Sequence, residues 1–340
     1  MVEIDKSAKI TILGAGAIGC TVAARLILAG FEHVSLIARG ENLKQLKTEG
    51  IQLQDLTGTH QVNPFQVVEH ASELDAQDII FIATKAGALK QITASLHHLL
   101  HDETVIVPLI NGIPFWYFYQ GDSSQQPLKT IQCLDTDHYL MQHFPLKHLI
   151  GAVVFITAEL QGHGKVHSSN PYLIILGEPS HQITPRVQQL QQLFADTGIE
   201  SRIHESIRDQ IWTKVIANLS SNPLSVLTGA TLHDIYSHPH LHDVVTKMML
   251  EARQVAACYG ARINIDPTLF LKLGADMGEV HTSMWQDFQK KQPLELSVIA
   301  DAVLELAEGY NCPMPVTKQI CELTKYLSDR NMQTTTDKVA

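Results

Sequence analysis

The sequence KITIL (Lys9–Leu13) runs directly into GAGAIG (Gly14–Gly19), and a helix-like segment follows from Thr21 to Ala29. Short apolar runs such as KITIL are typical of buried strands. A G-x-G-x-x-G motif is a weak signal alone, but between a strand and a helix it indicates a dinucleotide-binding loop. The stretch therefore predicts that the chain opens with the first strand and helix of a nucleotide-binding sheet.

Each glycine of this loop has its own expected role. Gly14 permits a tight turn, Gly16 lets a pyrophosphate approach the backbone at the helix N-terminus, and Gly19 lets the helix pack closely on the strand. A glycine-rich turn without a ligand is the alternative. We expect the loop to bind the cofactor through six consecutive residues: Gly14, Ala15, Gly16, Ala17, Ile18 and Gly19.

The end of the next strand, His33 to Ala38, indicates which dinucleotide is bound. Sites that prefer NAD usually end this strand with an acidic residue that holds the ribose 2′-hydroxyl. Here the strand runs into Arg39 and Gly40 instead. An arginine can bind a 2′-phosphate through two charge-assisted hydrogen bonds, although it can also be a surface residue in a turn. Arg39 therefore predicts NADP(H) rather than NAD(H).

Strand-like and helix-like segments continue to alternate along the chain. The runs Asp78 to Ala83 and Thr104 to Leu109 are strand-like, and Gln91 to Leu100 between them is helix-like. This alternation predicts a doubly wound parallel sheet, in which residues just past the strand ends line the ligand crevice. Lys85 and Asn111 occupy such positions. Their alternatives are an exposed loop cation and a plain Asn-Gly turn.

The pattern changes in the second half of the chain. Three strand-like runs are expected as antiparallel additions to the sheet: Gly151 to Thr157, Lys165 to His167 and Tyr172 to Leu176. From Ile207 onward, long helical periodicities dominate. We therefore predict an α/β fold, with a Rossmann-type NADP-binding domain at residues 1–205 and an all-α substrate and catalytic domain at residues 206–340.

The candidate chemistry lies on the helix-like stretch from Ile211 to Pro223, which the proline is expected to end or bend. Lys214, Asn218 and Asn222 are each four residues apart and therefore share one face of the helix. Their neighbours are apolar, and burying an ammonium and two carboxamides is costly unless they have partners. A ligand that needs a proton donor and hydrogen bonds is one such partner, and a solvated polar face is the alternative.

Composition narrows the classes of partner. The 340 residues are 45% hydrophobic and 18% charged, and the formal charge of −10 argues against nucleic acid or an anionic membrane as partner. The 18 histidines show no metal-ligand spacing, so no metal site is expected. Five scattered cysteines without a C-x-x-C pair suit free thiols in a reducing cytoplasm, and no run is long enough to span a membrane.

Taken together, these motifs resemble those of the ketopantoate reductase (2-dehydropantoate 2-reductase) family. The matching segments follow the family's order over most of the chain: Gly14–Gly19, Lys85, Asn111-Gly112, Lys214 to Pro223, Ser283–Asp287 and Glu295. The resemblance implies a Rossmann-type domain and a helical domain with a small 2-oxo acid bound between them. It also implies reduction of 2-dehydropantoate to pantoate by NADPH, on the route to pantothenate and coenzyme A.

The resemblance assigns roles to individual residues. Lys214 is similar to the family's catalytic acid, and Glu295 to the residue that holds the substrate's hydroxyl end. The positions similar to its substrate-binding residues are Asn218, Asn222 and Ser283, and Asn111 is expected to contact the substrate as well as the cofactor. The positions similar to its cofactor contacts are Arg39 at the 2′-phosphate, Asn111 near the nicotinamide ribose and Lys85 near the cofactor–substrate cleft.

These residue types suit the reduction of a 2-oxo acid. Lys214 can stabilise the negative charge that develops on the carbonyl oxygen and can donate a proton to it. Desolvation would lower the pKa of Lys214 and a nearby Glu295 would raise it, and the sequence leaves this contest open. Ser283 and Glu295 also have structural alternatives, as a helix N-cap and as an acid that complements a helix dipole.

The chain departs from the family pattern in two places. Ser297 stands where many relatives have an acidic residue, and the stretch from Ile113 to Gly151 looks longer than in compact relatives. These differences leave open a reductase of another branched 2-oxo acid, or a non-catalytic NADPH-binding protein. The aromatic run Phe115 to Tyr119 suits packing, a lid or the contact of a homodimer.

Overall fold

The computed structural model describes the backbone of residues 5–121 and 129–336, and the side chains as far as residue 333. These residues divide into two compact units. The N-terminal unit falls within Met1–Ile110, Trp116–Thr130 and His138–Ile207, and the C-terminal unit within Asn111–Phe115, Ile131–Asp137 and Arg208–Ala340. The predicted domain boundary near residue 205 falls close to the start of the helical unit. Two short earlier segments also belong to that unit, so one boundary does not separate the two units completely.

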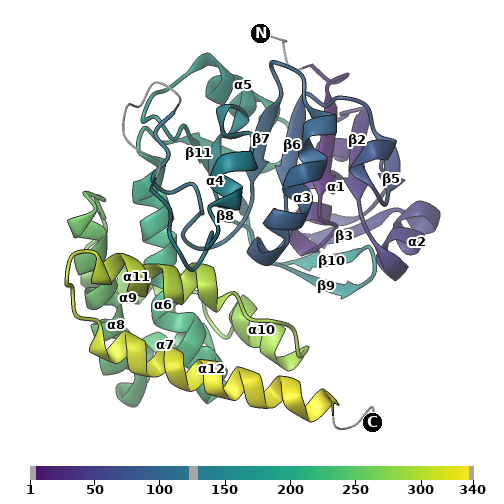
Figure 1. The fold of residues 1–340 in the computed structure, drawn as a ribbon. Coiled ribbons are helices and arrows are strands. Elements are labelled where there is room, and N and C mark those ends of the chain that lie inside the picture. Colours follow the sequence, from purple (N-terminus) through teal and green to yellow (C-terminus); the bar gives the residue numbers. More distant parts are fainter. Residues whose placement is uncertain (1–4, 122–128, 337–340) are drawn as a thin grey trace. The chain divides into compact units, whose positions relative to one another are not determined.

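The N-terminal unit is built on a five-stranded parallel sheet in the order β5-β2-β1-β6-β7. Its strands are β1 (Lys9–Leu13), β2 (His33–Ile37), β5 (Gln66–Val68), β6 (Ile79–Ile82) and β7 (Val105–Pro108). Every residue of β6 and β7 is buried, as expected for parallel strands that are covered on both faces. Figure 1 shows β6 and β7 side by side, with α3 in front of them.

Five helices belong to this unit in the described residues: α1 (Ala17–Leu28), α2 (Gly40–Glu49), α3 (Leu89–Leu96), α4 (Tyr139–His143) and α5 (Pro185–Leu193). Helix α1 starts earlier than the predicted Thr21, because Ala17 to Gly19 of the glycine motif already have helical backbone. Its side chains Cys20, Val22 and Leu26 are fully buried in the core of the unit. The helix therefore holds the glycine loop firmly against the sheet.

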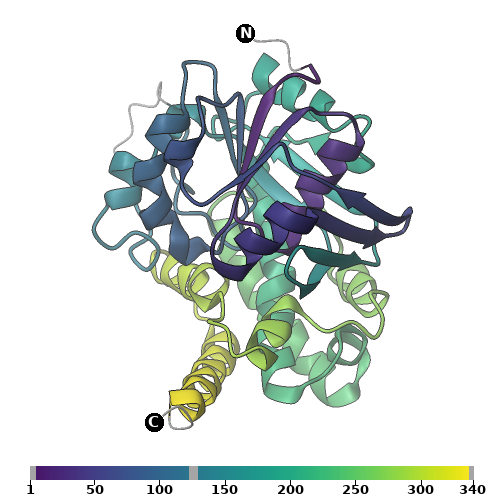
Figure 2. The same cartoon turned by 90° about the vertical axis from the view of Figure 1, so that its right-hand side faces the viewer.

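In the part of the chain that the structure describes, seven further strands form two smaller sheets. One has the order β4-β3-β10-β9 and the other β12-β11-β8. Their bounds are β3 (Ile51–Asp55), β4 (Gly58–Val62), β8 (Gly151–Phe155), β9 (Ala158–Gly162), β10 (Lys165–Ser168), β11 (Tyr172–Gly177) and β12 (Ile199–Ile203). Figure 2 shows the unit turned by 90°.

The predicted antiparallel additions to the parallel sheet are therefore wrong. Strand β10 pairs parallel with β3 and antiparallel with β9, while β11 pairs parallel with β12 and antiparallel with β8. Among the described residues, an isolated bridge from Ile106 to Leu149 is the strand-type pairing that connects this region to β7. The strands were recognisable from their apolar runs, but their partners lie far away in sequence, where local patterns carry no information.

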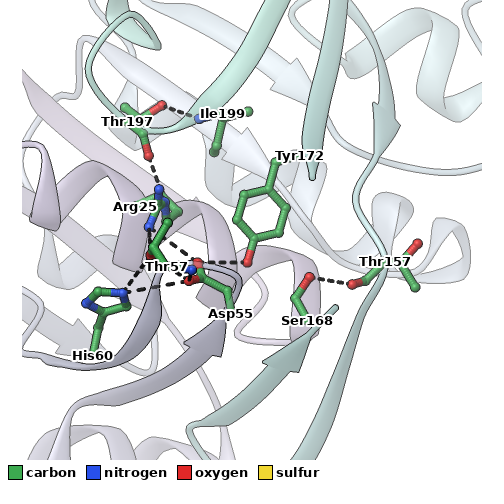
Figure 3. A network of polar contacts seen from close by, with 9 residues as sticks. All are labelled: Arg25, Asp55, Thr57, His60, Thr157, Ser168, Tyr172, Thr197 and Ile199. Atoms are coloured by element: carbon green, nitrogen blue, oxygen red, sulfur yellow. Dashed lines mark hydrogen bonds and ion pairs between the residues drawn. The ribbon is translucent and has the colours of Figure 1, made fainter. Parts of the chain in front are cut away.

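A buried polar network joins α1 to both smaller sheets (Figure 3). The guanidinium of Arg25 donates to the Thr197 carbonyl over 2.7 Å and to the Asp55 carboxylate over 3.3 Å. The hydroxyl of Tyr172, on β11, donates to the same carboxylate over 3.0 Å. The side chains of Arg25 and Asp55 are only 10% and 2% exposed, so this is a buried ion pair.

The C-terminal unit is helical within the described residues. It contains α6 (Ile207–Thr228) apart from its first residue, α7 (Leu232–Ser237), α8 (Pro239–Cys258), α9 (Pro267–Ala275), α10 (Ser283–Gln289), α11 (Ala302–Glu308) and α12 (Pro315–Thr336), which is the yellow helix in Figures 1 and 2. A π-helical turn, Ser297–Asp301, leads into α11. No helix in the described part of the chain is both long and apolar enough to cross a membrane.

Pro223 lies inside α6, and the helix continues to Thr228. The sequence predicted that this proline would end or bend the helix, and an end at this point is wrong. Tertiary contacts support the turn beyond it. Leu224 is buried in a cluster with Tyr236 and Met248, and the Pro223 carbonyl accepts a hydrogen bond from Thr324 over 3.3 Å.

Two short segments outside the helices complete this unit. The carboxylate of Glu305 accepts the backbone N–H groups of Gln132 at 2.6 Å and Cys133 at 2.9 Å, which fastens the segment Ile131–Asp137 to α11. The other segment, Asn111–Phe115, carries a predicted site residue. The predicted fold class, a Rossmann-type α/β domain followed by a helical domain, is confirmed.

Candidate active site

The glycine loop has the geometry that its sequence predicts. Gly14 has a φ of +104°, and a Cβ there would lie 2.8 Å from the Thr84 side chain. A Cβ on Gly19 would overlap the carbonyl oxygen of Gly14, so only glycine allows this approach of helix to loop. A Cβ on Gly16 would meet no atom within 4 Å, which leaves open space at the N-terminus of α1. Such a helix end favours a phosphate.

A groove of about 760 Å³ lies along this loop in the N-terminal unit. The side chains that line it come from the ends of several parallel strands, as expected for a doubly wound sheet. Arg39, which precedes α2, is exposed at the groove, and Glu69 and His70 line it as well. The predicted cation at the end of the second strand is therefore placed beside the predicted loop.

Two groove residues were not identified from the sequence. Asn42 donates from Nδ2 to the Ala15 carbonyl over 2.7 Å and accepts the Gly164 N–H over 3.1 Å, so it fixes the glycine loop to the turn between β9 and β10. The Thr84 hydroxyl is buried and has no hydrogen-bond partner within the described residues. An unpaired buried hydroxyl beside open space fits a polar ligand. No sequence signal marks either residue.

Lys85 is exposed just after β6, at the start of a short 3₁₀ turn, Ala86–Ala88. It is close in sequence to Thr84 but is not among the residues that line the groove. Its predicted role near the cofactor stays a prediction.

In the C-terminal unit, three predicted residues meet through their side chains. The ammonium of Lys214, on α6, donates to Oδ1 of Asn111 over 2.7 Å. Nδ2 of Asn111 in turn lies 3.5 Å from Oε2 of Glu295, at the long limit of a hydrogen bond. Asn111 is 103 residues from Lys214 and 184 residues from Glu295 in sequence. All three side chains are half-buried.

The backbone around Gly112 explains why Asn111 reaches this position. Gly112 has a φ of +87°, and a Cβ there would overlap the backbone carbonyl of Val298. The next residue, Ile113, donates its N–H to that same carbonyl over 2.7 Å. Val298 belongs to the π-helical turn that follows Glu295. The turn therefore holds Asn111 and Glu295 together, and π-helical turns often occur at functional sites.

Burial decides the protonation of Lys214. Desolvation lowers the pKa of Lys214 to about 8, and the Glu295 carboxylate acts in the opposite direction by raising it. The sequence left open which effect is larger, and desolvation outweighs the effect of Glu295. A lysine with this pKa is still charged at neutral pH but gives up its proton far more readily than an exposed one.

The remaining predicted substrate residues lie outside this hydrogen-bonded trio. Asn218 is half-buried one turn after Lys214 on α6. Asn222 is 3% exposed, accepts the Ser221 hydroxyl over 3.4 Å, and has an Nδ2 group with no partner in the described residues. Ser283 is exposed at the first residue of α10.

The N-cap of α10 is Thr282, not Ser283. The Thr282 hydroxyl accepts the Trp285 N–H over 3.2 Å and contacts the Ser225 hydroxyl at 2.5 Å. The alternative interpretation of Ser283 as a helix cap is therefore wrong. Ser283 is exposed beside this cap, and its role as a substrate-binding residue stays a prediction.

Comparison with known proteins agrees with this arrangement. The sequence profile described as "Ketopantoate reductase PanE/ApbA" matches residues 10–181, and that described as "Ketopantoate reductase PanE/ApbA C terminal" matches residues 206–328. The chain belongs to the ketopantoate reductase family. It is 33% identical over 320 residues to a 2-dehydropantoate 2-reductase of Mesorhizobium japonicum, covering 94% of this chain and 98% of that protein.

Solved structures extend the family likeness to three dimensions. A provisionally named ketopantoate reductase from Ralstonia solanacearum MolK2 has a TM-score of 0.87 at 31% identity, over 96% of this chain and 99% of that chain. A D-mandelate dehydrogenase, solved with NADH and anilino(oxo)acetate, has a TM-score of 0.80 at 22% identity, over 95% of this chain and 99% of that chain. The second likeness concerns the fold alone. The family is one of oxidoreductases, and this chain spans almost the full length of these relatives.

Proposed function

We propose that this protein reduces 2-dehydropantoate to pantoate with NADPH, and so serves the route to pantothenate and coenzyme A. The observation that carries the proposal is the chain of side chains Lys214, Asn111 and Glu295, in which a lysine of lowered pKa donates to an amide that in turn reaches a carboxylate. A protein that only bound the cofactor would need the glycine loop but no such donor. The family relationship favours the same reaction.

In the proposed mechanism, the bound nicotinamide supplies a hydride to the C2 carbonyl carbon. Lys214 stabilises the negative charge that develops on the carbonyl oxygen and then donates its proton to that oxygen. Asn111 orients the Lys214 ammonium through its Oδ1 atom. Glu295 keeps the ammonium more basic than burial alone would allow, and we assign it to the substrate's hydroxyl end. Asn218, Asn222 and Ser283 are assigned to the substrate as neutral groups that can orient a carboxylate.

The groove supports binding of a dinucleotide by Gly14, Ala15, Gly16, Ala17, Ile18 and Gly19, because it combines open space at Gly16 with the unpaired Thr84 hydroxyl. We assign Arg39 to the 2′-phosphate, which makes NADP(H) the preferred cofactor. Glu69 also lines the groove and is the acid that could hold a 2′-hydroxyl instead. Lys85 and Asn111 are assigned to the nicotinamide side of the cofactor.

The cofactor assignment is tested with Arg39→Ala. We expect the Kd for NADPH to rise roughly 10-fold or more, since a charge-assisted phosphate contact is lost, while the Kd for NADH stays within about twofold. Lys47→Ala is the matched control, because Lys47 is an exposed cation on α2, the helix that Arg39 precedes, and does not line the groove. Equal catalytic efficiency of the unchanged enzyme with NADH and NADPH would contradict the assignment.

The substrate assignment is tested by measuring NADPH consumption with a panel of 2-oxo acids. The highest kcat/KM should be found for 2-dehydropantoate. A different branched 2-oxo acid as best substrate would favour the alternative reductase, which the exposed Ser297 leaves open. NADPH binding without turnover on any acid would favour a non-catalytic protein.

The aromatic run is used mainly for packing. Phe115, Trp116, Tyr117 and Tyr119 are buried, and Trp116 lies directly against Gly151. These side chains therefore do not supply an exposed contact for a second copy. A homodimer stays a prediction, to be checked by light scattering, and a cytoplasmic location stays a prediction from cysteine usage.

A further inference from the structure

Two cysteines that are far apart in sequence meet in the C-terminal unit. Cys258 is the last residue of α8, and Cys312 lies in the turn between α11 and α12. Their Sγ atoms are 3.3 Å apart, although 54 residues separate them in the chain. Both side chains are half-buried, so a small reagent can reach them.

The surrounding contacts fix this pairing. The Tyr259 ring packs edge-on against Tyr310 with centroids 4.8 Å apart, and the Tyr259 hydroxyl donates to the Leu306 carbonyl over 3.0 Å. The Cys312 N–H donates to the Ala307 carbonyl over 2.9 Å. These contacts hold the end of α8 against the turn after α11, so the approach of the two sulfurs follows from the packing of both elements.

A disulfide bond is about 2.05 Å long, so the sulfurs need to move closer by only a little more than 1 Å. The other cysteines are placed differently. Cys20 and Cys321 are buried, and burial raises the pKa of each thiol to about 12. Cys133 is exposed on the separate segment Ile131–Asp137. The pair at the end of α8 therefore combines proximity with access.

We propose that Cys258 and Cys312 form a thiol–disulfide exchange site, which reacts with a low-molecular-weight disulfide such as glutathione disulfide and closes into an intramolecular disulfide. One cysteine thiolate attacks a sulfur of glutathione disulfide, and the S–S bond breaks with release of one glutathione thiolate. The second cysteine loses its proton, attacks the mixed disulfide and releases the second glutathione. The two protein thiols are oxidised by two electrons, and the reagent is reduced to two thiols.

The new bond would close a loop of the chain from residue 258 to residue 312. This loop contains α9, α10, Glu295 and α11, whereas Lys214 and Asn111 lie outside it. Closing a loop of this length restricts the unfolded chain, so the oxidised protein should unfold at a higher temperature. The hydrogen bond shared with Cys258 raises the pKa of Cys312, so thiolate is scarce at neutral pH and exchange should be slow.

The test uses the full-length protein, reduced and then freed of reductant. After overnight incubation with glutathione disulfide, unreduced peptide mass spectrometry should show a Cys258–Cys312 cross-link. Free-thiol titration of the denatured Cys133→Ser variant should show two fewer thiols after oxidation than before it. Its melting temperature should rise by several degrees, and a reducing agent should reverse the change.

Variants that lack one cysteine distinguish an intramolecular disulfide from a glutathione adduct on a single thiol. Cys258→Ser and Cys312→Ser should each keep a glutathione adduct on the remaining cysteine and show no rise in melting temperature. Cys133→Ser should form the internal cross-link as the unchanged protein does. Both sulfurs remaining alkylatable after incubation, or carrying only glutathione adducts in the unchanged protein, would overturn the proposal.

Discussion

Lys214 is less basic than an ordinary lysine, and its surroundings explain its lowered pKa. Apolar neighbours on α6 take water away from the ammonium, and Asn111 accepts one of its hydrogen bonds. Glu295 restores part of the basicity. Because the amide carries no net charge, it can fix the direction of the ammonium without adding a second charge beside it. The residue therefore has the two properties of a general acid, a fixed position and a pKa close to neutral.

Removing this side chain should abolish most of the activity. Lys214→Ala is expected to lower turnover by roughly 10²–10⁴-fold, the range for a lost acid or oxyanion-stabilising group. Lys214→Arg should also be poor, since guanidinium is bulkier and hardly ever gives up its proton. Steady-state kinetics measures the loss, with thermal melting and NADPH affinity as controls. Near-normal turnover in a well-folded Lys214→Ala enzyme would mean that the lysine is not the acid.

The pKa of Lys214 also predicts a pH profile. Because reduction needs the protonated amine, kcat/KM should be level below about pH 8 and fall roughly tenfold per pH unit above it. Glu295→Gln should move the break to lower pH, since the carboxylate that raises the pKa is gone. Glu308→Gln makes the same change of charge at an exposed position on α11 and should leave the break where it was. A break that moves equally in both variants would argue against a specific effect of Glu295 on the pKa of Lys214.

At the scale of elements, the π-helical turn and the segment Asn111–Phe115 act as one structure. Gly112→Ala places a methyl group into the Val298 carbonyl and forces the segment to shift. A displacement of about 1 Å at a catalytic group can cost about 10²-fold in rate, so turnover should fall sharply while NADPH still binds. Single-turnover kinetics with NADPH titration measures both.

Gly278→Ala is the matched control for this variant. Gly278 has a similar φ of +80°, but a Cβ there would meet no atom within 4 Å. It therefore reports the strain of a left-handed alanine alone, about 1–3 kcal/mol. If both variants lost the same activity, overlap with Val298 would not be the cause.

The ion pair between Arg25 and Asp55 predicts a stability effect in the N-terminal unit. Arg25→Met leaves the Asp55 carboxylate buried without its cation and should cost about 3–5 kcal/mol in urea unfolding. Arg202→Met breaks an exposed pair with Glu200 and should cost less than about 1 kcal/mol. Similar losses in the two variants would contradict a special role for the buried pair.

The same carboxylate should make stability depend on pH. Burial raises the pKa of Asp55, but hydrogen bonds from Thr57 and Tyr172, together with Arg25, outweigh it and hold the pKa below its usual value. A lowered folded pKa means that the stabilisation is present at neutral pH and is lost as the pH falls through that pKa. The free energies of unfolding in urea should therefore differ between the unchanged protein and Arg25→Met at neutral pH and become similar in acid.

At the scale of the whole molecule, the sequence predicted what depends on local pattern. The strand KITIL was predicted at its observed bounds, and Lys214, Asn218 and Asn222 lie on one helix, as their spacing predicted. Side-chain periodicity and glycine spacing are written into neighbouring residues, so they can be read without a structure. The tight turn at Gly14 and the close packing at Gly19 were predictable for the same reason.

Long-range pairing could not be predicted. The contact of Lys214 with Asn111, the β3–β10 pairing and the approach of Cys258 to Cys312 each join segments that no local pattern connects. Asn42 was missed because an asparagine early in a helix has many ordinary uses. The π-helical turn has no sequence signature, yet it sets the position of two catalytic candidates.

The path of the chain has a consequence for recombination between relatives. A crossover near residue 205 would join the last helices of one parent to the Asn111–Phe115 and Ile131–Asp137 segments of the other. The donor lysine would then come from one ancestor and its amide acceptor from another, with a foreign pair of backbone N–H groups facing Glu305. An active chimera should therefore take all three segments of the C-terminal unit from the same parent. For the same reason, residues 112 and 298 should covary among relatives.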